Sequence, residues 1–557
     1  AIFKAHYSIL KHAVKHGWSI KRWQKVANSM IEKEPGNPKI HRLRVIHLYK
    51  ANYNLSLSIF WARKLVHSAE DSGAFNKNCF GGRPGMSAAE PVFIEELQVS
   101  LSYLSRTNQV VFHNDATSCY DRIIITLANM IARRFGMSQE VCSIHGETLA
   151  KMKYFVSTAL GITEDSYCNT IMTPVHGTGQ GSCASPSAWL QICSVLFDCH
   201  ERLSTGAQYF SPDRMTVVEN SMTGYVDDTK CVTNDMNQTH PLPVNELVST
   251  MQEDSQVWGD LLHTSGGALE IPKCNFYIMH WEFDKAGLPR LNSRIDTTIQ
   301  LENGDRTNSV FLQNDSVTKA HKKLGCWKSA NRDQKRQVSV LQAKSDNYAR
   351  IIMSSAVTRR DNWTAYYAIY QTGMTFVLPT SYLPKKNLDR IEMKAVTATL
   401  TKGGYVSKFP RKVAFGPQQF GGLAMRMLWC EQLILQVQLL VKHLRCPSDC
   451  QKMLQINLAW AQLGTGMGFP ILGNPDMELP HLECAWFASL RDGLTMVDGG
   501  IEMTTTHVVP ARRVADTHLM DGVCGSKLFS KSEIKKINSC RLDLQVTLMS
   551  VISTTCG

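Results

Sequence analysis

The chain has 557 residues with a formal net charge of +12, and 43% of its residues are hydrophobic and 19% charged. This length indicates several domains, and the composition excludes a highly charged, aromatic-poor disordered chain. No window reaches 18 consecutive apolar residues, so we expect no membrane span, and no signal peptide either. The first residue is Ala1 and not Met, which is typical of a fragment or a processed product.

The first 110 residues predict a strand, a turn and two helical stretches. Residues 1–65 mix basic and aromatic residues with short apolar runs, and a turn at residues 35–38 interrupts them, which favours a strand and turn followed by a helix. A second turn cluster occupies residues 80–85. After it, Phe93, Leu97, Leu101 and Leu104 recur at helical spacing, and the pattern predicts an amphipathic helix.

Strands and helices then alternate. Residues 110–112 form an apolar run that predicts a buried strand ending at residues 113–115, and helical periodicity follows over residues 123–131. A glycine-rich loop at residues 177–181 leads into a helix that begins near Ser185, with Pro186 in its first turn. The alternation predicts an α+β sheet domain.

The last strand pair of this region carries two adjacent acids. Residues 222–233 predict two short strands joined by a tight turn at Asp227 and Asp228. Beyond about residue 330 strand signals become rare, and residues 433–444 have the periodicity of an amphipathic helix. We therefore expect a mostly helical C-terminal part.

Positive charge gathers in two stretches of the chain. Residues 1–70 have a local charge of +10, and residues 319–350 have a local charge of +7. Two basic stretches on either side of a more acidic middle fit a polyanion that is bound at two places around a carboxylate site. The alternative for either stretch alone is a solvated helix face.

The 17 cysteines are odd in number and irregularly spaced, which favours free thiols in a reducing compartment. His443, Cys446 and Cys450 are the nearest approach to a zinc motif, but a second ligand pair is missing, so we expect ordinary thiols there. The localisation that follows is intracellular, in the nucleus or the cytoplasm.

Three carboxylates are the candidates for chemistry. Asp115 ends a predicted strand, and the pair Asp227 and Asp228 lies at a strand turn far away in the sequence. Adjacent acids at an apolar turn repel each other, and a divalent cation would neutralise them. Three such groups could hold two Mg²⁺ ions about 3.5–4 Å apart for phosphoryl transfer. The alternative is an ordinary polar turn.

These residues lie within motifs that resemble those of reverse transcriptases, in the same order along the chain. The matching segments are residues 115–121, 177–186 and 225–228 for the first three palm motifs, residues 266–273 for the next palm block, residues 322–325 for the primer grip, Lys33 with residues 43–46 for the basic fingers segment, and residues 80–85 for a block found in non-LTR retrotransposon enzymes. Together they cover roughly residues 30–330. We therefore expect a reverse transcriptase domain of the non-LTR retrotransposon type.

The resemblance implies an α+β right-hand polymerase with fingers, a palm made of an antiparallel sheet backed by helices, a helical thumb and a mostly helical C-terminal region. The implied divisions are residues 1–110 for the fingers with an N-terminal extension, 111–330 for the palm with a fingers or insert segment at about 135–170, 331–450 for the thumb or connection, and 451–557 for a C-terminal region of unknown role. Only about 30 residues precede the first match, so no upstream endonuclease is expected.

The resemblance also assigns the catalytic residues. Asp115 and Asp227 would bind the metal directly, and Asp228 would be an essential carboxylate that coordinates more loosely. The cofactor would be two Mg²⁺ ions, which Mn²⁺ can replace. Lys273 would act as the general acid that protonates the departing pyrophosphate.

Substrate contacts are assigned in the same way. Lys33 and Arg44 match fingers cations that contact the triphosphate. Tyr120 matches the aromatic residue that packs beneath the sugar and disfavours a 2′-hydroxyl. Gln180 and Gly181 would lie against the incoming nucleotide and the template base, Tyr225 belongs to the substrate site, and Leu324 and Gly325 would form the primer grip. The implied partners are an RNA template, a DNA or RNA primer and dNTPs, without a membrane.

The sequence departs from the family at two positions. Gly82 stands where the family has an aromatic residue, and Gly179 stands where it often has a basic one. Three alternatives remain: an RNA-templated RNA polymerase, a telomerase-like or maturase-like enzyme, and a noncatalytic RNA-binding protein derived from a polymerase. All three carboxylates are present, which favours the enzyme.

Overall fold

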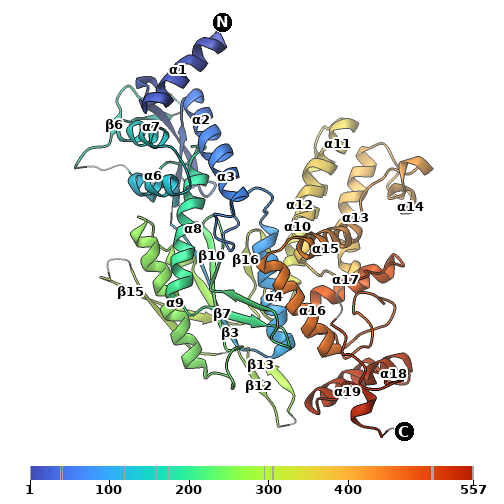
Figure 1. Ribbon diagram of the computed structural model, residues 1–557. Helices are drawn as coiled ribbons and strands as arrows, with labels where there is room; N and C mark the ends of the chain where they lie inside the picture. Colours follow the sequence, from blue (N-terminus) through green and yellow to red (C-terminus); the bar gives the residue numbers. More distant parts are fainter. Residues whose placement is uncertain are drawn as a thin grey trace.

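The computed structural model describes residues 2–37, 39, 42–117, 119–158, 160–172, 176–285, 287–293, 295–303, 306–503 and 507–554. The chain is a mixed α/β protein, with its sheets in the N-terminal part and helices in the C-terminal part (Figure 1). In the described residues, no strand longer than an isolated bridge follows Lys328. This confirms the expected change to helical structure near residue 330.

The N-terminal sheet has five strands in the order β2-β1-β4-β5, with β6 paired to β4. β1 is antiparallel to β2 and parallel to β4. Segment 135–170 therefore contributes strands to the same sheet as residues 25–48. The bounds are β1 (Lys25–Glu32), β2 (Leu43–Leu48), β4 (Lys153–Thr158), β5 (Gly161–Ile162) and β6 (Tyr167–Cys168).

Helices surround this sheet. The strand and the helix expected for residues 1–65 are present as β1 and α2, but a second strand, β2, which was not expected, lies between them. Pro38 in the expected turn lies outside the described residues. A long first helix, α1, was not predicted, because many of its positions are Lys or His and only Leu10, Ala13 and Val14 reach the core. The helices are α1 (Ile2–His16), α2 (Ala51–Leu57), a π-helical segment (Ser58–Leu65), α3 (Val66–Asp71), α6 (Ile125–Arg134) and α7 (Gln139–Ala150).

The larger sheet has six strands in the order β14-β15-β11-β3-β10-β9. Its neighbouring strands are antiparallel except for β11 and β15, which are parallel. The expectation of a purely antiparallel sheet was therefore wrong, because the chain leaves β11 through further strands and returns in the same direction. The bounds are β3 (Gln109–Asp115), β9 (Met222–Tyr225), β10 (Asp228–Asn234), β11 (Asn275–Met279), β14 (Thr298–Glu302) and β15 (Ser309–Asp315).

Helices cover both faces of this sheet. Along β3, Val110 and Phe112 join the core formed with α8 and α9, whereas Val111 points to the opposite core formed with α4. The alternation follows from the two-residue period of a strand, and it places Asp115 on the α4 side together with Val111. The helices are α4 (Ala89–Ser105), α8 (Ser185–Leu203) and α9 (Val244–Thr264), and a short α5 (Cys119–Arg122) follows β3.

Among the described residues, the remaining strands form three two-stranded hairpins. The β16–β17 hairpin lies close to β10 and α4 in Figure 1, and an ion pair between Lys328 and Glu96 joins it to α4. The hairpins are β7 (Ala207–Phe210) with β8 (Val217–Asn220), β12 (Trp281–Phe283) with β13 (Pro289–Leu291), and β16 (His321–Lys323) with β17 (Cys326–Lys328).

Residues 338–428 share a core around Leu341, Tyr366, Leu388 and Leu428, whereas buried residues between 433 and 494 join the core on the α4 side of the larger sheet. In Figure 1, α10–α13 and α1–α3 stand on opposite sides of β10 and β16. The helices are α10 (Lys335–Ser354), α11 (Arg359–Ala365), α12 (Thr372–Thr375), α13 (Lys385–Lys402), α14 (Arg411–Ala414), α15 (Leu428–Arg445), α16 (Asp449–Thr465), α17 (Ala485–Met496), α18 (Leu519–Gly525) and α19 (Lys531–Asp543). Within the described part of the chain, no helix is both long and apolar enough to cross a membrane.

Candidate active site

Two antiparallel strands bring the predicted carboxylates together. Asp115 ends β3 and is the register partner of Asp228, the first residue of β10. Asp228 is also the partner of Tyr225 at the end of β9, so Val226 and Asp227 form the turn between the strands. Val226 has a φ of 60°, a left-handed conformation that is rare for a β-branched residue. The tight turn expected at the acid pair is thus present, with Asp227 inside it.

The turn is held in place by contacts from three other segments. The indole Nε1 of Trp189 on α8 donates to the carbonyl oxygen of Val226 at 2.7 Å. The backbone nitrogen of Ala116 donates to the carbonyl oxygen of Asp227 at 3.2 Å. A Cβ atom on Gly81 would lie 2.3 Å from the nitrogen of Val226, so only glycine permits this close approach. These contacts explain how a strained turn is kept beside the sheet edge.

Lys273 joins the carboxylates as expected. Its Nζ lies 2.5 Å from Oδ2 of Asp115, in an ion pair in which 63% of the lysine side chain is exposed. The loop that carries Lys273 is tied to the same strand end, because the nitrogen of Glu270 donates to the carbonyl oxygen of Asp115 at 2.8 Å. Thr117 Oγ1 also donates to the carboxylate of Glu270 at 2.8 Å.

The electrostatics of the site favour a bound cation. Burial, with Asp115 and Asp228 as neighbouring charges, raises the pKa of Asp227. Burial also raises the pKa of Asp228, against the opposing effect of Lys323. Ionising three such groups together is costly unless positive charge approaches them.

The donor set consists of carboxylate oxygens, which are the ligands that Mg²⁺ and Mn²⁺ prefer. Among the described residues, no three His, Cys, Asp or Glu side chains already converge as a closed ligand set. One oxygen of Asp115 is instead engaged by Lys273. The residues therefore fit the expected metal by their chemistry and by the register of β3 and β10.

The glycine-rich loop packs against the short helix α5, which follows Asp115 in the chain. Thr178 donates its N–H to the carbonyl oxygen of Tyr120 at 2.9 Å, and Nε2 of Gln180 donates to Oδ2 of Asp121 at 3.3 Å. The loop thus packs on α5, directly after the strand that ends at Asp115. Gly177 permits this contact, because a Cβ atom there would lie 2.5 Å from the backbone of Asp121.

His47 on β2 fixes the other side of this loop and was not found from the sequence. The backbone N–H of His47 donates to the carbonyl oxygen of Gln180 at 2.6 Å. A Cβ atom on Gly181 would lie 2.4 Å from the carbonyl oxygen of His47. The ring of His47 fills the space beside Gly179, where a Cβ atom would lie 1.7 Å from Nδ1. At Gly179, where the sequence departs from the family, the ring of His47 therefore occupies the space that a side chain would need.

The two predicted fingers cations lie on the β1–β2 hairpin. Lys33 directly follows β1. Its positive charge opposes the burial that raises the pKa of Asp121. Arg44 lies on β2 opposite Ile31 and is exposed. Neither contacts the carboxylates of β3 and β10 through a hydrogen bond or ion pair in the described structure, so their assignment to a triphosphate remains a prediction.

Leu324 and Gly325 form the turn of the β16–β17 hairpin, with φ values of 45° and 87°. The charge of the preceding residue, Lys323, opposes the effect of burial on the pKa of Asp228, as do the charges of Lys273 and Lys322. The predicted primer-grip residues thus lie at the tip of a hairpin beside the carboxylates.

Other residues near the site were also missed. Glu95 of α4, His113 of β3 and Lys230 of β10 form a buried cluster behind the carboxylates. The sequence does carry a signal for Glu95, because an acid within the apolar run of a core helix is costly to bury without a partner.

Among the described residues, no group of His, Cys, Asp and Glu around His443 could hold a metal ion. His443 is buried and stacks on Phe93, at 5.8 Å between the ring centroids. All cysteines among the described residues are free.

No protein-family model matches the chain, and no curated protein matches it. Solved structures of telomerases are similar to it. The telomerase of Candida albicans in complex with the TWJ fragment of telomeric RNA is 12% identical over 81% of this chain and 68% of that chain, with a TM-score of 0.34. Apo telomerase of Candida tropicalis is 13% identical over 82% and 72% of the two chains, with a TM-score of 0.33. At these values the similarity assigns no activity, substrate or partner to this chain.

Proposed function

We propose that the chain is an RNA-directed DNA polymerase that extends a primer 3′-hydroxyl with dNTPs, in the context of a non-LTR-type retroelement. The observation that carries the proposal is the meeting of Asp115, Asp227 and Asp228 at one sheet edge, with Lys273 paired to Asp115. Two-strand carboxylate sites of this kind suit phosphoryl transfer, in which positioning and charge stabilisation do most of the catalysis.

In the proposed reaction, the primer 3′-oxygen attacks the α-phosphorus of the dNTP. A new oxygen–phosphorus bond forms while the bond to the pyrophosphate oxygen breaks, and the hydroxyl proton leaves to solvent. Bound Mg²⁺ would activate the 3′-oxygen and stabilise the leaving oxygens. Lys273 would give a proton to the departing pyrophosphate, for which the exposure of its ammonium group is suitable.

The neighbouring segments support the assignment of substrates. The loop with Gln180 and Gly181 lies between β2 and α5, beside the carboxylates, where an incoming nucleotide would meet it. Tyr120 lies on α5, between Asp115 and Asp121 in the sequence and partly buried in the core. The basic stretches at residues 1–70 and 319–350 would bind the template and primer backbones.

Primer extension on an RNA template with Mg²⁺ tests the proposal, with dNTPs and NTPs compared for the wild type and for Asp227→Ala. The exposed acid Glu253 on α9 supplies the control variant Glu253→Gln. We expect extension with dNTPs that is lost in Asp227→Ala and kept in Glu253→Gln. Extension with NTPs alone would favour an RNA polymerase. A folded wild type that binds RNA and adds no nucleotide would favour a noncatalytic binder.

A further inference from the structure

A row of polar residues lies directly behind the carboxylates on the same face of the sheet. Lys230 and His113 are register partners on β10 and β3, as are Asp228 and Asp115 two residues away. Side chains two residues apart in a strand share a face. His113 and Lys230 are therefore one step deeper in the molecule than the carboxylates, on the side covered by α4.

Glu95 of α4 accepts contacts from this row. Its Oε1 lies 3.0 Å from Nε2 of His113 and accepts a hydrogen bond from the hydroxyl of Tyr277 at 3.3 Å. Its Oε2 lies 4.0 Å from Nζ of Lys230, and 13% of the Glu95 side chain is exposed. Although burial alone would raise it, His113 and Lys230 hold the pKa of Glu95 below its usual range. Through these contacts with His113 and Lys230, Glu95 joins α4 to two strands of the site.

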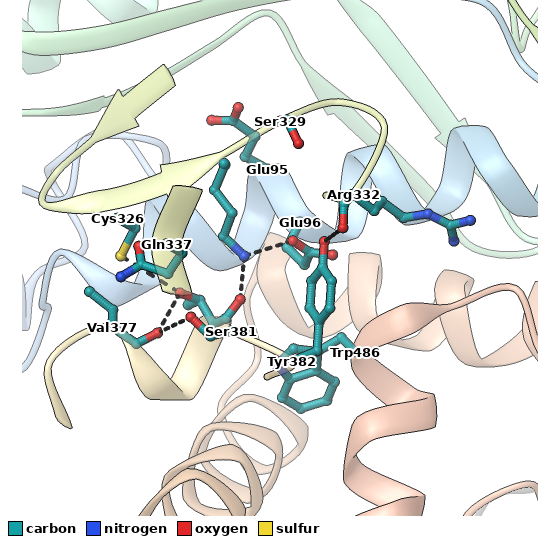
Figure 2. Close-up of polar contacts among 12 residues, drawn as sticks. Glu95, Glu96, Cys326, Ser329, Arg332, Gln337, Val377, Ser381, Tyr382 and Trp486 are labelled. Atoms are coloured by element: carbon teal, nitrogen blue, oxygen red, sulfur yellow. Dashed lines mark hydrogen bonds and ion pairs between the residues drawn. The ribbon is translucent and has the colours of Figure 1, made fainter. Parts of the chain in front are cut away.

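The β16–β17 hairpin lies beside two neighbouring acids of α4, Glu95 and Glu96. Lys323, Glu95 and Asp228 line one cavity of about 30 Å³ together with Lys230. Burial lowers the pKa of Lys323, and the charges of the two acids oppose this effect. At the other end of the hairpin, Nζ of Lys328 lies 2.8 Å from Oε2 of Glu96, whose side chain is only 4% exposed. Figure 2 shows Glu95 and Glu96 on one helix, beside Cys326 of the hairpin and Ser329, which directly follows it.

The hairpin has further contacts at its base, and at its tip Leu324 packs against the core of the C-terminal helices. Nζ of Lys328 also donates to the carbonyl oxygen of Thr380, and the nitrogen of Trp327 donates to Oε1 of Gln337 at 2.7 Å. These contacts belong to β17. Lys323 is the last residue of β16, directly before the tip. Glu95 is the buried acid of α4 that lies beside it.

We propose that Glu95 is a positioning residue that holds the tip of the β16–β17 hairpin, through Lys323, at the carboxylate edge formed by Asp115 and Asp228. Glu96 holds the base of the hairpin through Lys328. We call these two contacts, Glu95 with Lys323 and Glu96 with Lys328, the clamp. The proposal rests on the proposed function for its consequence, which is that the hairpin tip places the primer end. Loss of the Glu95 charge would loosen the tip, which would then be held by the packing of Leu324, and would leave Lys323 with Asp228 as its acidic neighbour.

The variants Glu95→Gln and Lys323→Met test the clamp from its two sides. Glu90→Gln is the matched control, because Glu90 is a buried acid on the same helix that pairs with Lys442 of α15 and not with the hairpin. Hydrogen exchange of the amides of residues 321–328 reports on the hairpin without requiring catalysis. Primer extension separates KM for primer–template, KM for dNTP and kcat.

We expect exchange in residues 321–328 to become at least about tenfold faster in both clamp variants and not in Glu90→Gln. KM for primer–template should rise by roughly tenfold, with KM for dNTP unchanged. The double variant should exceed neither single one, since both remove one coupling. If Glu95→Gln does not fold, Lys323→Met decides alone.

Unchanged exchange at the hairpin in the folded clamp variants, or equal acceleration in Glu90→Gln, would overturn the proposal. A wild type without polymerase activity would overturn the proposed function, whereas the exchange measurement would still decide on the clamp.

Discussion

Asp115 and Asp228 lie directly opposite each other across β3 and β10. Opposed residues in an antiparallel pair have Cα atoms about 4.5–5.5 Å apart, and like charges at such positions repel. Lys273 offsets part of this repulsion from one side and Lys323 from the other. A register shift of one residue would turn the side chain of Asp228 to the opposite face, so the pairing of these strands is itself a requirement of the site.

Lys273→Met should lower kcat by about 10²–10⁴-fold, with little change in KM, if its ammonium is the general acid. Its ion pair with Asp115 is well exposed and adds at most about 1 kcal/mol to stability, so the melting temperature should hardly change. The matched control is Lys151→Met, which removes an exposed lysine 2.6 Å from Glu147 on α7. Single-turnover rates measure the effect, and equal losses in both variants would exclude a role in chemistry.

The local elements of the site could be predicted because their signals are local. The apolar run before Asp115 became β3, and the acid pair became the turn between β9 and β10. Hydrophobic period and turn composition reside within a few residues. The sequence was therefore sufficient for the elements on which the carboxylates lie.

The rest depends on partners that are distant in the sequence. β1 pairs in parallel with β4, although Lys25 and its partner Lys153 are far apart in the chain. Glu95 is recognisable as important only when His113 and Lys230 are seen to surround it. His47 has a role only because Gly179 and Gly181 leave room for it. Long-range pairing and side-chain satisfaction are properties of the folded chain, and a single sequence does not display them.

Tyr120→Val should weaken discrimination against ribonucleotides, because a smaller side chain leaves space for a 2′-hydroxyl beneath the sugar. Tyr120→Phe keeps the ring and should keep the selectivity. The ratio of kcat/KM for dNTPs to that for NTPs is the measurement, and a decrease of roughly 10–200-fold is expected for the valine variant. An unchanged ratio in Tyr120→Val would remove this residue from the substrate site.

Gly81→Ala should impair nucleotide addition more than it impairs folding. The new methyl group would lie 2.3 Å from the nitrogen of Val226 and would displace the turn that carries Asp227. Gly373→Ala is the control, since no atom lies within 4 Å of a Cβ at that helical position, and it should stabilise the protein by about 0.5–1 kcal/mol. Extension rates compared with melting temperatures test the difference, which an active Gly81→Ala variant would contradict.

Glu392 on α13 should make stability fall as the pH rises towards neutrality. Burial raises the pKa of Glu392 to about 7, although the nitrogen of Leu428 donates to its Oε2 at 2.9 Å. An unfolded glutamate titrates near pH 4.3, so between that pH and about 7 the folded state binds more protons than the unfolded state. The stabilisation is complete below pH 4.3 and is lost as the pH passes through the folded pKa.

Glu392→Gln keeps an acceptor for Leu428 and carries no charge, so it should remove this loss. At pH 8 the variant should be more stable than the wild type by on the order of 3 kcal/mol, and near pH 4 the two should be nearly equal. Urea unfolding at both pH values, monitored by tryptophan fluorescence, measures the difference. The exposed acid Glu253 serves again as the control, because Glu253→Gln should shift stability equally little at both values. A Glu392→Gln variant without a pH-dependent gain would show that the folded protein accommodates the charge of Glu392 at neutral pH.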